Sequence, residues 1–302
     1  MRHWKYRVGR CLILAQLAMI APVLGAAPIT SNTAVPVGKG EFVFREQFLL
    51  RQREDADNPL DRDIRIRGAI SVLGYGINPD LAVFGVLPWL DKEMDVTTPV
   101  GRRQRQTSGI GDLTVFARYT LYKENGPGWT RRLAPIVGIK APTGEDNDRD
   151  ALGRLPRRFQ LGSGSWDGFV GLVYTWQTQA WQIDAQARYR KNGSHDGYTA
   201  GDAVNLDASW QYRLWPRQLG SGVPGFLYGV LETNLSHTER DRIATGINNN
   251  SGGTRWFITP GLQYVTRRWV VEAAVQLPAA QNLHGQTIED EFILVGGFRV
   301  NF

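Results

Sequence analysis

Residues 181–190 read WQIDAQARYR and alternate strictly between two kinds of side chain. One parity holds Trp, Ile, Ala, Ala and Tyr, and the other holds Gln, Asp, Gln, Arg and Arg. Successive side chains of a β-strand point to opposite faces, so this pattern predicts a strand with one apolar and one polar face. We expect Trp181, Ile183, Ala187 and Tyr189 to face an apolar medium.

The same period of two recurs along most of the chain, without a sustained helical period after residue 26. Twelve strands are predicted: Glu41–Arg51, Asp63–Val72, Leu81–Asp91, Asp112–Tyr122, Leu133–Ala141, Asp167–Trp176, Trp181–Arg190, Asn205–Leu214, Gly225–Ser236, Thr254–Val265, Trp269–Leu277 and Glu291–Phe302. The alternative is a barrel of ten or fourteen strands, if the segment near Leu133 is assigned wrongly.

The connections between these strands alternate in length. Short links cover residues 76–80, 177–180 and 266–268, and two medium links, rich in Gly and Pro, cover 123–131 and 215–224. The connections between them are long and polar: 52–62, 92–108, 143–161, 191–201, 237–253 and 278–290. Outer-membrane barrels have short periplasmic turns and long external loops, whereas a soluble sandwich has no reason to alternate. The fold class predicted is all-β, an antiparallel transmembrane β-barrel of about twelve strands with both termini periplasmic.

Composition agrees with this fold. Of 302 residues, 42% are apolar and 21% are charged, and no apolar run reaches 18 residues, which excludes a helical membrane protein. Aromatic side chains lie near many strand ends, as in the aromatic girdles of a membrane barrel. The alternative is that they form the core of a soluble sandwich. The residues are Phe42, Trp89, Tyr119, Trp181, Tyr189, Tyr212, Trp256, Tyr264 and Trp269.

The first 26 residues have the pattern of a secretory signal peptide. Four basic residues precede a short apolar segment, Cys11–Leu24, which small residues follow. About 14 apolar residues are too few for a membrane anchor. The predicted division is a cleaved signal, residues 1–26, and an outer-membrane barrel, residues 27–302.

Removing residues 1–26 changes the charge and the cysteine count. The formal charge falls from +6 to +2, so a nucleic-acid partner is not expected. Cys11 is the only cysteine, which excludes a disulfide framework and a cysteine-bound metal in the mature chain. The expected surroundings are membrane lipid and lipopolysaccharide. The last strand ends in Phe302, and this ending looks like the signal that the barrel-assembly machinery recognises.

Five short segments resemble a known family. They are 73–77 (LGYGI) with Leu87-Pro88, 109–113 (GIGDL), 138–144 (GIKAPTG), 260–264 (PGLQY) and 276–278 (QLP). They are similar, in the same order, to segments of the outer-membrane transporter family labelled putative meta-pathway of phenol degradation. The resemblance implies an outer-membrane barrel that passes small, often aromatic, compounds. It carries no set of substrate residues.

The sequence does not indicate an enzyme, a metal site or a cofactor. His195, His237 and His284 fall in different polar loops without short-spaced partners. Ser236 and His237 are neighbours on one strand and should point to opposite faces, which argues against a barrel-embedded hydrolase. The acidic run from Glu145 to Asp150 lacks the Gly and distal Glu of an EF-hand, so we expect a solvated loop.

The predicted function is an outer-membrane channel or facilitator for passive uptake of small, aromatic or anionic solutes. Nothing in the sequence resembles an N-terminal plug. A structural or adhesion barrel, or an outer-membrane enzyme, would be the alternatives. The charged residues expected to line the lumen could favour anions or pair with one another across strands. They are Arg45, Arg65, Arg67, Arg118, Asp184, Arg188, Arg190, Asp207, Arg213, Glu232, Arg255, Glu272 and Arg299.

Overall fold

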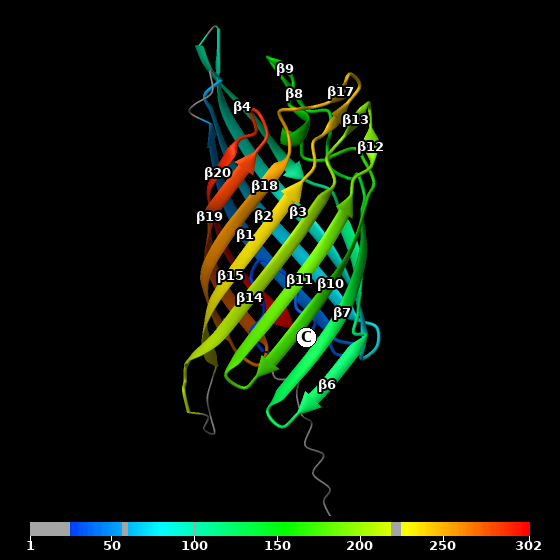
Figure 1. The fold of residues 1–302 in the computed structure, drawn as a ribbon, viewed down its shortest axis with the longest axis vertical. Helices are drawn as coiled ribbons and strands as arrows, with labels where there is room; N and C mark the ends of the chain where they lie inside the picture. Colours follow the sequence, from blue (N-terminus) through cyan, green and yellow to red (C-terminus); the bar gives the residue numbers. More distant parts are fainter. Residues whose placement is uncertain (1–24, 56–59, 100, 219–224) are drawn as a thin grey trace, which may run out of the picture.

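The computed structural model describes residues 25–55, 60–99, 101–218 and 225–302. They form one closed antiparallel β-barrel of twelve strands, as predicted (Figure 1). Eleven barrel strands are continuous: β1 (Phe42–Asp55), β2 (Arg62–Gly76), β3 (Leu81–Thr98), β7 (Trp129–Lys140), β10 (Asp167–Thr178), β11 (Trp181–Lys191), β14 (Ala203–Trp215), β15 (Phe226–Thr238), β18 (Gly253–Val265), β19 (Trp269–Leu283) and β20 (Glu289–Asn301). The fourth strand in chain order runs in three pieces, β4 (Gly101–Ile110), β5 (Thr114–Tyr119) and β6 (Tyr122–Gly126).

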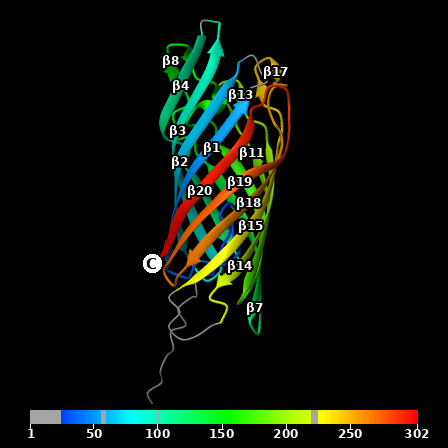
Figure 2. The same ribbon diagram turned by 90° about the vertical axis from the view of Figure 1, so that its left-hand side faces the viewer.

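The barrel closes by pairing its first strand with its last. β1 pairs antiparallel with both β2 and β20, and β7 pairs with both β5 and β10. The C-terminus and the short links 77–80, 179–180 and 266–268 lie at one end (Figures 1 and 2), which we call the periplasmic end. At the opposite, external end the loops carry small elements: β8 (Arg149–Asp150), β9 (Gly153–Arg154), the 3₁₀ turn η1 (Arg157–Phe159), β12 (Ser194–His195), β13 (Tyr198–Thr199), β16 (Arg242–Ile243) and β17 (Gly246–Ile247).

One predicted loop is a strand pair. Residues 92–108 were expected to form a polar external loop, but β3 continues to Thr98 and pairs with β4 from Trp89↔Ile110 to Thr98↔Gly101. The hairpin projects beyond the external rim (Figures 1 and 2). Its polar side chains misled the sequence analysis because a strand outside the bilayer has no lipid to face and needs no apolar side.

The outer wall carries the expected aromatic side chains. Trp89, Tyr119, Tyr189, Tyr212 and Trp269 are each more than 40% exposed on the outer face. On β11, Gln182 and Asp184 are almost completely buried in the interior, so the opposite parity, beginning at Trp181, faces outward as predicted. Lipid and lipopolysaccharide therefore surround an apolar band bounded by aromatic rings.

One side of the inner wall is built from phenylalanine rings lying over glycines. Phe84 and Phe116 stack with ring centroids 4.8 Å apart, and Phe169 lies 6.1 Å from Phe116. A Cβ added to Gly138 would lie 2.2 Å from the ring of Phe169, and one added to Gly74 would lie 2.5 Å from the ring of Phe84. The glycines therefore make the space in which these rings lie against the wall.

Gly138→Ala should therefore destabilise the barrel by about 1–3 kcal/mol, the usual range for overpacking. The matched control is Gly85→Ala on β3, because an added Cβ there meets nothing within 4 Å. Urea titration of the protein refolded into lipid vesicles, followed by tryptophan fluorescence, measures both variants. Equal unfolding midpoints for the two variants would contradict this account of the wall.

Candidate functional site

Residues 25–40 lie inside the barrel, where the sequence analysis expected no plug. This segment starts near the periplasmic end, where Arg299 Nη2 donates to Gly25 O at 3.2 Å. It rises to about mid-height, crosses the lumen and leads into β1, where Gly40 N donates to Gly76 O at the end of β2 at 2.8 Å. In Figure 1 its blue trace runs within the ring of strands. We call residues 25–37 the lumen segment.

The rising half of the lumen segment is held by β15, β18 and β1. Ala27 N donates to Gln263 Oε1 at 3.0 Å, and Ile29 N donates to Glu232 Oε1 at 2.6 Å. Thr30 N donates to the second oxygen of Glu232 at 2.9 Å. From the β1 side, Arg45 Nη2 donates to Ile29 O at 2.7 Å. Side chains of the wall thus replace the strand partners that this irregular backbone lacks.

The returning half is held on the opposite wall. Asn32 N donates to Gln186 Oε1 at 3.2 Å and Ala34 N to Thr175 Oγ1 at 2.7 Å. Arg118 Nη2 donates to Val35 O at 2.7 Å. Ala34 is fully buried and packs on the β7 and β10 side of the lumen. The lumen segment therefore spans the interior from wall to wall and occludes its lower half.

Eleven of the thirteen predicted lining residues point inward. Each lies on the strand face that carries buried lumen side chains or that contacts the lumen segment. A role of these residues in conduction remains a prediction. They are Arg45, Arg118, Asp184, Arg188, Arg190, Asp207, Arg213, Glu232, Arg255, Glu272 and Arg299.

The prediction was wrong for Arg65 and Arg67, which face outward. Arg67 Nη1 lies 3.0 Å from Asp91 Oδ2, beside the exposed Trp89, and the side chain is 48% exposed. The opposite parity of β2 carries Ile64, which is buried against residues of the external loop that enters the barrel mouth. Near the external rim the outer face is polar and the inner face apolar, so polar parity no longer marks the lumen.

The inward charges are partly paired and partly used for other contacts. Arg45 pairs with Glu272, at 2.9 Å from Nε to Oε1. Asp184 and Glu232, by contrast, accept hydrogen bonds only from neutral groups in the described residues, as when Gln182 Nε2 donates to Asp184 Oδ2 at 2.7 Å. The expectation of mutual pairing therefore holds for some charges and fails for these two carboxylates.

Two residues missed by the sequence analysis complete the upper lumen. Asp290 lies within ion-pair distance of three guanidinium groups: 2.5 Å from Arg51 Nε, 3.3 Å from Arg53 Nε and 2.8 Å from Arg255 Nε. The predicted strands ended at Arg51 and began at Glu291, so Arg53 and Asp290 were assigned to loops. In the structure β1 continues to Asp55 and β20 begins at Glu289, and a bulge leaves Glu291 unpaired with β1, so that Asp290 is the partner of Arg53.

Asp241 joins three external loops. Its carboxylate accepts hydrogen bonds from Arg158 Nε at 2.7 Å, Tyr198 OH at 2.7 Å and Gly201 N at 2.9 Å. Its own N–H donates to Ser251 Oγ at 2.8 Å. Burial raises the pKa of Asp241, but the bond and charge of Arg158, with the Gly201 amide and Tyr198, outweigh it and leave the pKa below its usual value.

The residues weighed for catalysis or metal binding do not converge. His195 Nε2 lies 3.0 Å from Asp146 Oδ2, whereas His237 Nδ1 contacts Thr254 Oγ1 at 2.9 Å. His237 was expected in a loop but lies on β15, opposite Thr254 of β18, because β15 continues to Thr238. Within the described ranges no group of three or more His, Cys, Asp or Glu side chains could hold a metal ion. In the same ranges there is no helix long and apolar enough to cross a bilayer.

The family described as putative MetA-pathway of phenol degradation matches residues 57–281. The chain belongs to this family. A comparison with curated protein sequences gave no significant match.

Among solved structures, the fold is similar to that of an outer membrane channel from Pseudomonas putida F1, with a TM-score of 0.64 and 15% identity over 91% of this chain and 100% of that chain. The β domain of the Bordetella autotransporter BrkA gives a TM-score of 0.45 and 14% identity over 87% of this chain and 100% of that chain. The barrel fold thus places this family member in the outer membrane.

The hydrogen bonds and the ion pair of the Asp241 carboxylate should break only at acidic pH. Because the pKa of Asp241 is lowered in the folded protein, its stabilising contribution is complete above the unfolded value of about 3.9 and is lost as the pH falls below it. Proteolysis of the external loops should therefore be slow at pH 7 and 5 and faster at pH 3, measured at each pH with a protease active there and normalised to the cleavage of an unfolded substrate. Asp241→Asn should show fast cleavage already at pH 7, and wild-type cleavage that begins near pH 6 would contradict the assignment.

Proposed function

We propose that this protein is a passive outer-membrane channel for small organic solutes, closed and opened by the lumen segment. The observation that supports it is the set of side-chain hydrogen bonds that hold residues 27–35 from opposite walls. A segment held by about one bond per amide, each contributing roughly 0.5–1.5 kcal/mol, can leave without unfolding the barrel. The wall itself is continuous without it, because all twelve strands pair with one another.

The solute class follows from the inner wall beside the segment. Phe84, Phe116 and Phe169 present ring faces on one side, and Arg118 lies 4.8 Å from the ring centroid of Phe84. Arg188 similarly lies 5.8 Å from the ring of Phe169. Alternating aromatic faces and guanidinium groups suit small aromatic solutes and favour those that carry negative charge.

Export and assembly are further parts of the proposal. The predicted signal, residues 1–26, lies almost wholly outside the described residues. Phe302 directly follows β20 and is 67% exposed at the periplasmic end, where its ring stacks on Phe42 with centroids 5.7 Å apart. This position supports recognition of the strand by the barrel-assembly machinery before closure with β1.

A structural barrel without conductance is the second candidate, favoured by the same occluded lumen. The two candidates differ in what happens when the lumen segment is removed. A variant lacking residues 28–36 should conduct continuously in planar bilayers, whereas the wild-type protein should show brief openings. A folded deletion variant without conductance would exclude the channel.

A cysteine pair tests whether the segment moves during gating. Ala34 N lies 2.7 Å from Thr175 Oγ1, so Ala34→Cys with Thr175→Cys places two thiols within reach of each other in a mature chain without other cysteines. The oxidised double variant should lose its openings, and reduction should restore them. Thr175→Cys alone is the control, and openings that persist in the oxidised pair would refute a moving segment.

Glu232→Gln should loosen the segment without removing it. Both Glu232 oxygens accept backbone N–H groups, and the amide nitrogen of Gln would face one of those donors. We expect a several-fold higher open probability in single-channel recordings. The matched control is Glu46→Gln on the outer face of β1, where Glu46 contacts Ser71 Oγ at 2.7 Å.

A further inference from the structure

We infer that the upper lumen holds a binding site for an organic carboxylate, in which arginines around Asp290 bind the carboxylate and a neighbouring apolar cluster binds its hydrocarbon body. The inference rests on the proposed function in one respect, that solutes enter this lumen from outside. It names a solute-binding site above the lumen segment.

The polar half of the site has more guanidinium groups than carboxylates. Arg51, Arg53 and Arg255 share Asp290, whose side chain is 0% exposed. Arg51 uses both Nε and Nη2 on the two oxygens of Asp290, at 2.5 and 2.9 Å. Arg53 Nε and Arg255 Nε lie 3.3 and 2.8 Å from Asp290, and the Nη2 of each donates to Ile288 O, so these donors already face protein oxygens. The Nη1 groups of the three arginines make no hydrogen bond within the described residues, and these are the donors that a second carboxylate would satisfy.

Further positive charge surrounds this group. Arg158, in the external loop, acts electrostatically on Arg53, Arg255 and Arg190. Neither Arg188 nor Arg190 has a carboxylate within 4.0 Å among the described residues, and the Nε of each is buried without a hydrogen bond. The side chains of Arg51, Arg53 and Arg255 are 31%, 20% and 14% exposed, so part of each remains accessible to a ligand.

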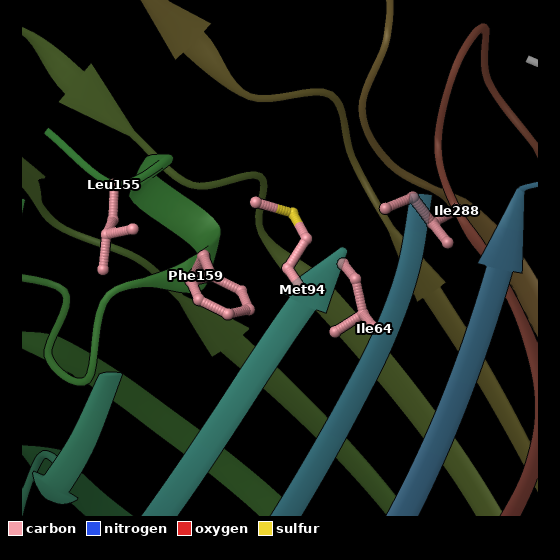
Figure 3. Packing of buried hydrophobic residues seen from close by; sticks show 5 residues of the cluster. All are labelled: Ile64, Met94, Leu155, Phe159 and Ile288. Atoms are coloured by element: carbon pink, nitrogen blue, oxygen red, sulfur yellow. The ribbon is translucent and has the colours of Figure 1, made fainter. Parts of the chain in front are cut away.

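The apolar half lies beside these arginines on the next strand. Arg53 pairs in register with Ile64, and Arg51 with Ile66. Ile64 belongs to a buried cluster with Met94, Leu155, Phe159 and Ile288, and Ile66 packs against it while remaining partly exposed. Figure 3 shows the ring of Phe159 and the chain of Met94 turned toward each other over the inner faces of β2 and β3.

Ile288 connects the two halves directly. Its carbonyl oxygen accepts hydrogen bonds from Arg53 Nη2 at 3.0 Å and Arg255 Nη2 at 3.1 Å, and its side chain belongs to the apolar cluster. Ile66, which pairs in register with Arg51, is the partly exposed member of this apolar group, so a ligand with its carboxylate on the arginines would place its body against Ile66. Benzoate has this form, whereas phosphate lacks the apolar body and benzyl alcohol lacks the charge.

The site can be tested by equilibrium binding of benzoate to the full-length folded barrel in detergent, followed by calorimetry. Benzoate should bind at least tenfold more tightly than benzyl alcohol or acetate. Arg53→Gln and Arg255→Gln should each weaken benzoate about tenfold, the usual effect of losing a charge-assisted hydrogen bond. Arg67→Gln is the matched control, because it removes a guanidinium from the outer wall and should leave the affinity unchanged.

Two further variants separate the halves of the site. Ile66→Ala should weaken benzoate and leave acetate unchanged, since only benzoate has a ring that would contact this partly exposed side chain. Asp290→Asn should strengthen benzoate binding by removing the internal competitor. The apparent size of unheated protein on gels confirms that each variant is folded. Equal affinity for benzoate and benzyl alcohol, or unchanged affinity in both arginine variants, would overturn the inference.

The site and the channel can fail independently. The oxidised Ala34→Cys, Thr175→Cys pair should bind benzoate with wild-type affinity, because the site lies above the lumen segment. A protein that binds benzoate but never conducts would retain the site and lose the proposed function. A protein that conducts but shows no saturable benzoate binding would lose the site alone.

Discussion

The constraint on which the whole structure depends is that backbone polar groups inside a bilayer must find partners within the protein. Twelve strands meet it by closing into a ring, with β1 paired to β20 along its length. The same requirement governs the lumen segment, whose irregular backbone has no strand neighbour. Glu232, Gln263 and Thr175 accept its amide hydrogens. These lumen side chains thus supply the hydrogen-bond partners that a strand finds in a neighbouring strand.

Burying carboxylates without cationic partners is costly, and the lumen shows why it is tolerated here. Glu232 is 1% exposed and Asp184 is 1% exposed, and each accepts hydrogen bonds from neutral donors. For Glu232 those donors belong largely to the lumen segment, so this carboxylate is well satisfied only while the segment is in place. Glu232 therefore ties the stability of the closed state to the presence of the segment.

Alternation along the strands was enough to predict the number of strands, their order and the outward face of β11. It failed at the external rim, because Arg65 and Arg67 lie where the environment outside the barrel is polar and the mouth inside is apolar. It also missed Arg53 and Asp290, because β1 and β20 extend beyond the predicted strands. Arg53 keeps the parity of Arg51, whereas a bulge at Glu291 changes the parity of β20 at Asp290. The lumen segment was unpredictable for a different reason: residues 25–37 have no strand period, and their partners are more than a hundred residues away for the most part.

The two levels of the lumen differ in their charged groups. Arg51, Arg53 and Arg255 outnumber Asp290 near the external end, whereas the middle holds carboxylates, those of Glu232, Asp184 and Asp207, together with the guanidinium groups of Arg45, Arg118 and Arg188. Of these carboxylates, only Glu232 accepts amide hydrogens of the lumen segment, because Asp184 and Asp207 are held by side chains of the wall. In the proposed open state Glu232 therefore loses the amides of Ile29 and Thr30, whereas Asp184 and Asp207 keep these wall partners. Binding at the proposed upper site would then depend on the arginines, and passage through the proposed channel on how water and solute replace the two amides at Glu232.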